Sequence, residues 1–349
     1  MPEFQIAKVL ILSTLAFTFA ILWTPLLTHY LYKYKLGKNI RNSGDTPIFS
    51  KLHAHKAGTP TMGGILIWLT LLILIILFNF LGNFLNWELL TKLNFLSRSE
   101  TLLPLGALIA TALVGLFDDW LDVRGKGAKG GGGLNVSHRL LIYAIIALIG
   151  ALWFYFKLDW TVLHVPFLGS FEIGWWYIPL FILVIISTAF SVNESDGLDG
   201  LAGGTLITSY VAFGVIAFSL GRYDLAAFCG VIIGGLLAFL WFNIPPARFY
   251  LGDTGAMSLG VTLAIIAMLT NYVILLPIIG LLFVFESLSV IVQVLHKKIR
   301  KRKLFLSTPI HHHFQAIGWS EPKIVMRFWV ISAITASIGI VLFLLDRGL

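Results

Sequence analysis

Long apolar stretches alternate with short polar segments along almost the whole chain. Because a helix needs about 20 apolar residues to cross a bilayer, the pattern predicts about ten transmembrane helices. Their approximate centres are residues 18, 71, 108, 147, 184, 212, 233, 262, 284 and 337. Neighbouring apolar runs merge around Asn271 and Pro277, where the boundaries are least sharp. The predicted fold is an all-α, polytopic membrane protein with a single transmembrane domain over residues 1–349.

Basic residues divide the connections between these helices into two sets. Five segments hold 19 of the 25 lysines and arginines, namely 32–60, 118–139, 193–204, 243–254 and 297–327. By the positive-inside rule these five loops lie on the cytoplasmic side, and both termini lie on the extracytoplasmic side. The opposite connections, 82–100 and 157–176, carry tryptophans that suit the membrane interface: Trp87, Trp160, Trp175 and Trp176.

Composition narrows the class of protein further. The chain is 58% hydrophobic and 12% charged, with a mean hydropathy of +0.88, whereas about a quarter of the residues of a soluble domain are charged. The single Cys229 excludes an intramolecular disulfide and a cluster of thiolate metal ligands. The net charge of +8 is concentrated in the five loops, so it indicates membrane orientation and no nucleic-acid partner. The first apolar run is long and lacks a small-residue cleavage site, so no cleavable signal peptide is predicted.

The segment 193–204 reads N-E-S-D-G-L-D-G-L-A-G-G and lies between two apolar runs. Asp196 and Asp199 are three residues apart, so a helical turn would place them on one face. Carboxylates at the edge of a membrane are costly unless water, a cation or a substrate meets them there. The segment therefore predicts the floor of a polar site, although a hydrated loop between two helices fits it equally well.

Two further acidic motifs stand at predicted helix ends. In F-D-D-W-L-D, the adjacent Asp118 and Asp119 would point about 100° apart on a helix, which predicts different tasks for them. One would face a metal ion or a reacting group while the other orients it, and Asp122 could share a face with Asp118. Asp253 stands just before another apolar run and is a candidate Mg²⁺ ligand. A tight polar turn is the alternative for that segment.

Basic motifs complete the predicted cytoplasmic face. Lys56 and Thr61 could bind an anionic group through ammonium and hydroxyl donors, and a basic loop lying against anionic lipid is the alternative. The run 297–303 is predicted to lie against lipid headgroups. The three histidines 311–313 suggest metal binding or phosphate contacts, and their spacing favours phosphate over zinc. Hard oxygen ligands beside cations are what Mg²⁺-dependent phosphoryl transfer requires.

These motifs, in this order, resemble the polyprenyl-phosphate N-acetylhexosamine-1-phosphate transferase superfamily. Within it, G-T-P-T-M-G-G at 58–64 and T-P-I-H-H-H-F at 308–314 resemble the phospho-N-acetylmuramoyl-pentapeptide-transferase family, the translocase I enzymes of peptidoglycan synthesis. The resemblance implies ten spans, a bacterial cytoplasmic membrane location, an active site facing the cytoplasm, Mg²⁺ and a homodimer. It implies transfer of phospho-MurNAc-pentapeptide from UDP-MurNAc-pentapeptide to undecaprenyl phosphate, which forms lipid I and UMP.

Roles carry over residue by residue. The resemblance makes Asp118, Asp119 and Asp253 the catalytic and magnesium-binding group, with Asp253 the expected metal ligand and the other two as further candidates. It implies that His311 lies near the reacting diphosphate, and that Asp196 and Phe249 lie near the uracil. The implied substrate-binding residues are Lys56, Thr61, Asn193, Asp196, Asp199, Asn243, Phe249, His312 and His313.

The chain departs from the family pattern at three places. Asp122 replaces a usual lysine, Glu194 falls where the family has leucine in N-L-T-D-G, and Gln315 replaces a common glutamate. Asp122 reverses a charge beside the predicted metal site, so Lys126 or Lys129 is expected to supply the local phosphate contact.

Three alternatives stay open at this point. The lipid phosphate could attack the diphosphate directly, or the reaction could pass through a phospho-aspartyl intermediate. UDP-GlcNAc could replace the muramoyl donor. A secondary transporter would place ionisable residues near mid-span along one pathway. Glu286 is the main acid at such a depth, and it is predicted to be a paired structural residue.

Overall fold

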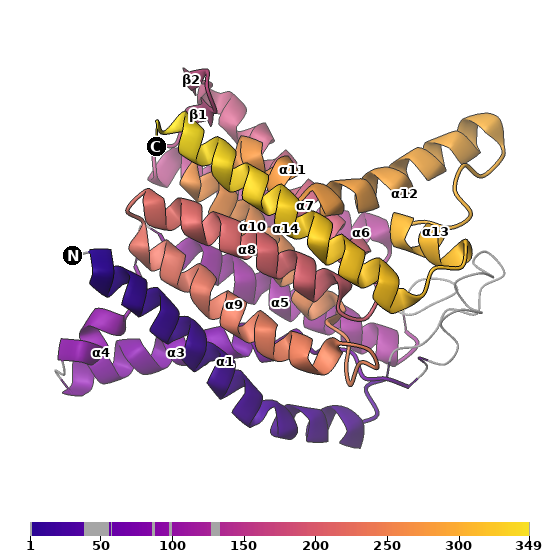
Figure 1. Ribbon diagram of the computed structural model, residues 1–349, viewed down its shortest axis with the longest axis horizontal. Coiled ribbons are helices and arrows are strands. Elements are labelled where there is room, and N and C mark those ends of the chain that lie inside the picture. The colour runs from indigo at the N-terminus through magenta and orange to yellow at the C-terminus, as the bar shows by residue number, and fades with distance from the viewer. Residues whose placement is uncertain are drawn as a thin grey trace.

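The computed structural model describes residues 2–37, 56, 58–85, 88–97, 100–126 and 133–348. Most of these residues belong to helices, which form one bundle and run broadly along its long axis (Figure 1). Trp87, Lys129 and the greater part of the loop 32–60 lie outside the described residues. The structure therefore does not bear on the expectations placed on them.

The long helices follow the apolar runs, which confirms the predicted all-α, polytopic membrane fold. Their bounds are α1 Pro2–Lys33, α3 Ile65–Leu85, α5 Leu102–Val123, α6 Val136–Lys157, α7 Tyr177–Ser195, α8 Leu201–Ser219, α9 Tyr223–Asn243, α10 Gly252–Thr270, α12 Leu281–Arg300 and α14 Glu321–Asp346. The short elements are α4 Glu88–Leu93, β1 Val162–Val165, β2 Gly169–Glu172, η2 Gly174–Trp176, η3 Val273–Leu275, α11 Leu276–Ile279 and α13 Ile310–Ala316. Within the described ranges, nine helices are long and apolar enough to cross a membrane.

The tenth predicted span is broken. α10 ends at Thr270 and is followed by Asn271, which adopts the left-handed conformation with φ 57°. The chain then passes through η3 and α11 and bends by 79° before α12 begins at Leu281. Together the bent pair makes a tenth span by length and composition. This break explains why the apolar runs merge near Asn271 and Pro277 in the sequence.

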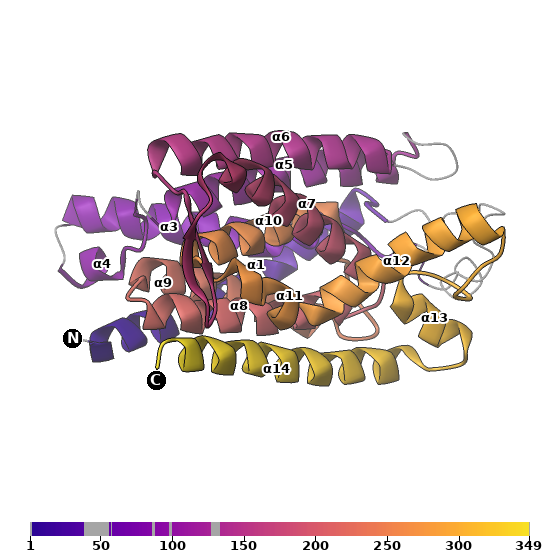
Figure 2. The same ribbon diagram turned by 90° about the horizontal axis from the view of Figure 1, so that it is seen from above.

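Helix α10 occupies the centre of the bundle. Of the residues in its membrane-spanning window, 94% are buried. Apolar and small residues cover all faces of this helix. It packs against α5, α7 and α8, and Figure 2 shows it between the α5–α6 layer and α14. A Cβ added to Gly115 of α5 would lie 2.4 Å from the carbonyl oxygen of Asp253. The missing side chain therefore lets α5 touch the first turn of α10 directly.

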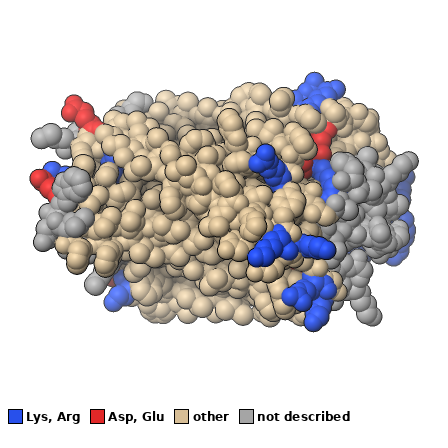
Figure 3. Space-filling model, turned by 90° about the horizontal axis from the view of Figure 1, so that it is seen from below, with Lys and Arg blue, Asp and Glu red and all other residues tan. Residues whose placement is uncertain are grey.

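Charge is segregated along the long axis of the molecule. Figure 3 shows a broad band without charge across one face, with lysines and arginines gathered toward one end. Both termini lie at one end of the bundle, and α13 lies at the other (Figure 1). The termini therefore share one side, as the even number of predicted spans requires.

The connection 157–176 contains structure that the apolar pattern did not predict. β1 and β2 form an antiparallel hairpin with Val162 opposite Glu172 and Val165 opposite Gly169. The carboxylate of Asp346, at the end of α14, accepts hydrogen bonds from the hairpin backbone at Phe167 and from the hydroxyl of Tyr272 at 2.8 Å. The hairpin is thereby tied to the end of the bundle that carries the termini.

Candidate active site

Four helices bring a cluster of polar side chains together at the end of the bundle opposite the termini. Arg139 of α6 lies at its centre. Its Nε is 2.7 Å from Oδ2 of Asp118 on α5, and its Nη2 is 2.9 Å from Oδ2 of Asp253 on α10. Asn193, near the end of α7, accepts a hydrogen bond from Arg139 at 3.2 Å and donates one to Asp253 at 2.5 Å. Three residues predicted from separate motifs therefore meet around one guanidinium group.

The two carboxylates that share Arg139 differ in their access to solvent. Asp118 is completely buried and also accepts a hydrogen bond from the backbone N–H of Leu134. A buried carboxylate needs such partners, because an unpaired charge in the interior costs several kcal/mol, roughly. The side chain of Asp253 remains 16% exposed. It is therefore the one of the two carboxylates that an incoming ligand can reach.

Asp119 has a different task from Asp118, as their helical spacing predicts. Its Oδ1 accepts hydrogen bonds from the Thr61 hydroxyl and from the backbone N–H of Asp253, both at 3.1 Å. Its Oδ2 accepts a bond from the backbone N–H of Thr254 at 3.0 Å. Asp119 therefore caps the N-terminus of α10 from a neighbouring helix. This cap fixes the backbone that carries Asp253, and it places the Thr61 hydroxyl inside the protein.

The variant Asp119→Asn is expected to lower thermal stability more than it changes substrate affinity. One acceptor oxygen becomes an NH₂ group, which leaves a backbone N–H of α10 facing a donor, at a cost of about 1–3 kcal/mol. The midpoint temperature of thermal unfolding in detergent should fall by several degrees. The control is Asp159→Asn, since Asp159 is exposed and asparagine tolerates its positive φ of 51°. Equal midpoints for the two variants would contradict the capping role.

Lys56 is held by two acidic side chains. Its Nζ is 2.6 Å from Oδ1 of Asp199 and 2.5 Å from Oε1 of Glu321, at the start of α14. The same Glu321 oxygen accepts the backbone N–H of Asp199 at 2.7 Å. Asp196 accepts the backbone N–H of Gly252 at 3.2 Å. The segment 193–204 is therefore anchored to three other parts of the chain. The Lys56 ammonium uses two of its three N–H donors on these carboxylates.

Asn243 and Phe249 support the loop between α9 and α10. The Asn243 side chain accepts the N–H of Gly200 at 2.8 Å and donates to the carbonyl of Phe249 at 2.9 Å. The Phe249 ring is fully buried and packs between Phe239 and Phe242. The family resemblance implies that Phe249 lies near the uracil, but in this structure its ring is fully covered by protein. Both residues hold this loop against the segment 193–204.

His311 forms a buried pair with Glu286. Its Nδ1 is 2.8 Å from Oε2 of Glu286, and both side chains are at most 1% exposed. Burial, reinforced by the nearby Lys56 ammonium, lowers the pKa of His311 to about 3, so the ring is neutral at pH 7. Its Nε2 has no hydrogen-bond partner among the described residues. That nitrogen faces Gly197, where an added Cβ would lie only 2.2 Å away.

The other two histidines lie beside this pair on α13. The ring of His312 is largely buried and its Nδ1 is 2.8 Å from Oε1 of Gln315. The ring of His313 accepts the backbone N–H of Leu306 at 3.3 Å. Gln315, where the family commonly has glutamate, thus orients His312 with a neutral amide. Of the other departures, Asp122 and Glu194 both take part in interactions in the structure.

A magnesium ion would find few ligands in the protein itself. Among the residues that the structure describes, no three His, Cys, Asp or Glu side chains are arranged to hold a metal ion. Mg²⁺ at phosphate sites commonly takes one or two carboxylates, water and oxygens of the substrate itself. Asp253, which is partly exposed, fits that kind of site, whereas Asp118 is completely buried. Both contact Arg139, so a metal ion would share or take over oxygens that the guanidinium holds.

Two site residues escaped sequence reasoning. Arg139 entered only the count of positive charges, although a cation near a helix N-terminus opposes the helix dipole and so calls for an anionic partner. The unfavourable position of Arg139 near a helix N-terminus was the signal in the sequence for an anionic partner. Glu321 gave none, because an acidic residue suits the first turn of a helix. The expected pairing of Glu286 is confirmed, and its partner is His311.

The fold and this cluster define the chain as a polytopic membrane transferase. The sequence model of glycosyl transferase family 4 matches residues 101–271, and signature 1 of the phospho-N-acetylmuramoyl-pentapeptide-transferases matches residues 56–67. These two segments include most of the cluster around Arg139, together with Lys56 and Thr61.

Curated relatives identify the family. A phospho-N-acetylmuramoyl-pentapeptide-transferase of Chloroflexus aggregans is 38% identical over 354 residues, which cover 98% of this chain and 91% of the relative. Relatives with the same name from Geobacillus sp. and Listeria welshimeri are 37% and 35% identical and cover 96% and 93% of this chain. The chain belongs to the phospho-N-acetylmuramoyl-pentapeptide-transferase family and is a phosphotransferase enzyme.

Proposed function

We propose that the chain transfers phospho-MurNAc-pentapeptide from UDP-MurNAc-pentapeptide to undecaprenyl phosphate in a Mg²⁺-dependent reaction that releases UMP and forms lipid I. The observation that carries this proposal is the convergence of Asp118, Asn193 and Asp253 on Arg139. Phosphoryl transfer depends mainly on positioned charges, which such a cluster supplies. The names of the relatives supply the transferred group, phospho-N-acetylmuramoyl-pentapeptide, and the family resemblance supplies the UDP-linked donor and the polyprenyl-phosphate acceptor.

In the proposed reaction, an oxygen of the lipid phosphate attacks the β-phosphorus, counted from uridine. The bond from that phosphorus to the bridging oxygen breaks, and UMP leaves with its electron pair. Asp118 and Asp119 are the candidates to accept a proton from the lipid phosphate. Asp118 is held by Leu134 and Arg139 and Asp119 by N–H and O–H donors, so either carboxylate must exchange a partner to do so. Magnesium, when bound at Asp253, would offset the charge of the diphosphate.

Several residues bind and orient the donor in this proposal. Lys56 offers its third N–H to a phosphate oxygen while Asp199 and Glu321 hold the ammonium in place. His311 is placed near the reacting diphosphate by the family resemblance, and its Nε2 lies against Gly197 of the segment 193–204. Arg139 keeps Asp118 and Asp253 from repelling one another while the anionic substrates enter.

The positive-inside pattern supports an active site that faces the cytoplasm from a bacterial cytoplasmic membrane. Both termini would then lie on the outer side. The family resemblance supports a homodimer as the working assembly.

The test is UMP release by detergent-purified protein given undecaprenyl phosphate, UDP-MurNAc-pentapeptide and Mg²⁺. Release should require both substrates and should stop when a chelator removes the metal. UDP-GlcNAc serves as the control donor. Turnover of UDP-GlcNAc but not of the muramoyl donor would overturn the substrate assignment, and turnover in excess chelator would overturn the role of magnesium.

A further inference from the structure

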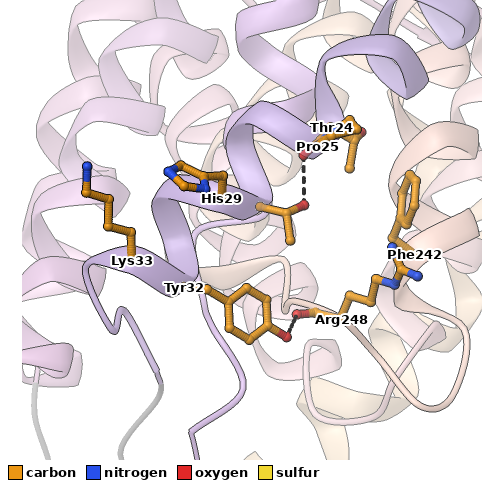
Figure 4. A pocket seen from close by; sticks show the side chains of 8 residues that line it. Thr24, Pro25, His29, Tyr32, Lys33, Phe242 and Arg248 are labelled. Atoms are coloured by element: carbon orange, nitrogen blue, oxygen red, sulfur yellow. Dashed lines mark hydrogen bonds between the residues drawn. The ribbon is translucent and has the colours of Figure 1, made fainter.

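Away from the catalytic cluster, a hollow of about 390 Å³ lies between the end of α1 and the loop that follows α9 (Figure 4). Its lining is Thr24, Pro25, Thr28, His29, Tyr32, Lys33, Phe242 and Arg248. It contains three nitrogen-bearing side chains that can carry positive charge and no acidic side chain. None of its lining residues takes part in the cluster around Arg139.

The sequence of α1 explains why this hollow exists. Pro25 lies inside the helix and cannot donate the hydrogen bond that a backbone N–H would make. The hydroxyls of Thr24 and Thr28 donate to carbonyls one turn earlier, which also favours bending. Figure 1 shows α1 changing direction in its second half. The last turns of α1 therefore diverge from α9 and leave space at the level of the basic loops.

The donors that remain available in the hollow are cationic. The Thr28 hydroxyl is used within its helix, and the Tyr32 hydroxyl donates to the carbonyl of Arg248 at 3.0 Å. The Arg248 guanidinium lies over the Phe242 ring at 5.5 Å. Lys33 and Arg248 form no ion pair with any residue that the structure describes. A ligand that pairs with both of these charges is an anion.

A second hollow, of about 480 Å³, follows along the same pair of helices toward the middle of the molecule. Its lining is mainly apolar: Ser13, Thr14, Phe17, Leu237, Leu240, Trp241 and Ile244. On α1 the two linings approach one another at Phe17 and Thr24, and on α9 they adjoin at Trp241 and Phe242. The apolar hollow therefore follows directly on the cationic one. Trp241 is 71% exposed, as expected of a side chain that meets lipid.

The two hollows along α1 and α9 are together called the seam. We propose that the seam binds an anionic phospholipid, with its phosphate at Lys33 and Arg248 and its acyl chains along α1 and α9 toward Trp241. A phospholipid supplies both the negative charge that Lys33 and Arg248 lack and apolar chains for the second hollow. A second copy of the chain is the competing occupant, and the oligomeric state of the variant below tests it. The proposal does not depend on the proposed function.

The test measures binding of phosphatidylglycerol and of phosphatidylcholine with identical acyl chains to the full-length, delipidated protein, by native mass spectrometry. Phosphatidylglycerol should bind at least about tenfold more tightly. The double variant Lys33→Gln/Arg248→Gln should lose about thirtyfold of that affinity, since each basic residue near a lipid surface contributes roughly a fivefold factor. The matched control is Arg124→Gln/Lys323→Gln, which removes two exposed basic residues elsewhere, and it should bind phosphatidylglycerol like the unmodified chain.

Four results would overturn the proposal. They are equal binding of the two lipids, equal losses in the two double variants, a change from dimer to monomer in the Lys33/Arg248 variant alone, and complete displacement of phosphatidylglycerol by equimolar undecaprenyl phosphate. The binding assay needs no turnover. A chain that binds phosphatidylglycerol at the seam but releases no UMP would therefore disprove only the proposed function.

A second measurement locates the acyl chains. Phosphatidylglycerol brominated on its chains should quench part of the tryptophan fluorescence, and Trp241→Phe should remove most of the quenching that occurs at low lipid concentration. Quenching that is unchanged in Trp241→Phe would contradict the placement of the chains.

Discussion

Replacing Arg139 by glutamine is expected to reduce UMP release by at least about a hundredfold, the scale seen when one preorganised charged donor is removed from an active site. Without the guanidinium, Asp118 and Asp253 become two neighbouring carboxylates with no cation between them. Asp118 is completely buried, so the two groups must separate or share a proton. Either change moves Asp253 from its place beside Asn193.

Stability should fall in the same variant. Breaking a buried ion pair by removing one partner costs about 3–5 kcal/mol, and thermal unfolding in detergent would report it. Arg139→Lys should recover the stability in part but little activity, because a compact ammonium cannot reach both carboxylates as the planar guanidinium does. Arg124→Gln is the control, since Arg124 is exposed and lies over the Trp120 ring. Near-normal turnover by Arg139→Gln would contradict the assignment of Arg139 to the active site.

Replacing Glu286 by leucine is expected to lower kcat by about ten- to a hundredfold, the range found when a partner that orients a functional histidine is removed. Glu286 fixes Nδ1 of His311, and this leaves Nε2 directed at Gly197. A ring without that partner can rotate, and its Nδ1 becomes an unsatisfied buried group. KM for the nucleotide should change less than kcat, because Glu286 is buried behind His311.

The conservative variant Glu286→Gln separates orientation from general damage. It keeps the shape and one hydrogen-bonding oxygen, so it should retain clearly more turnover than Glu286→Leu at similar thermal stability. Thr262→Val is the control for loss of a buried polar group, because the Thr262 hydroxyl bonds within its own helix. If Glu286→Gln and Glu286→Leu lose turnover equally, the orienting role is wrong.

Much of the fold was predictable because membrane spans are long and apolar, and because basic residues mark one side of them. The break after Asn271 left a trace in the sequence as two merging apolar runs, but its 79° angle depends on packing against other helices. The hairpin of β1 and β2 was missed because four-residue strands carry too few residues for a recognisable alternation. Its attachment to Asp346 joins segments far apart in the chain.

The site was predictable in its acidic and histidine motifs, which are dense and local. The partners of those motifs were not predictable, because they depend on which helices meet. Arg139 contacts Asp118, Asn193 and Asp253 across four helices. Glu321 reaches Lys56 over 265 positions of sequence. The burial of Phe249 likewise depends on rings contributed by α9.

The direct contact of Gly115 with the backbone of Asp253 has a consequence for heat inactivation. The spacing between the aspartates of α5 and that of α10 is set by the packing of two core helices, and not by a surface loop. Local opening of loops, which ordinarily precedes global unfolding, leaves that spacing unchanged. Loss of the paired-aspartate geometry on heating should therefore coincide with melting of the bundle itself, and any additive that raises the melting temperature should protect that geometry to the same degree.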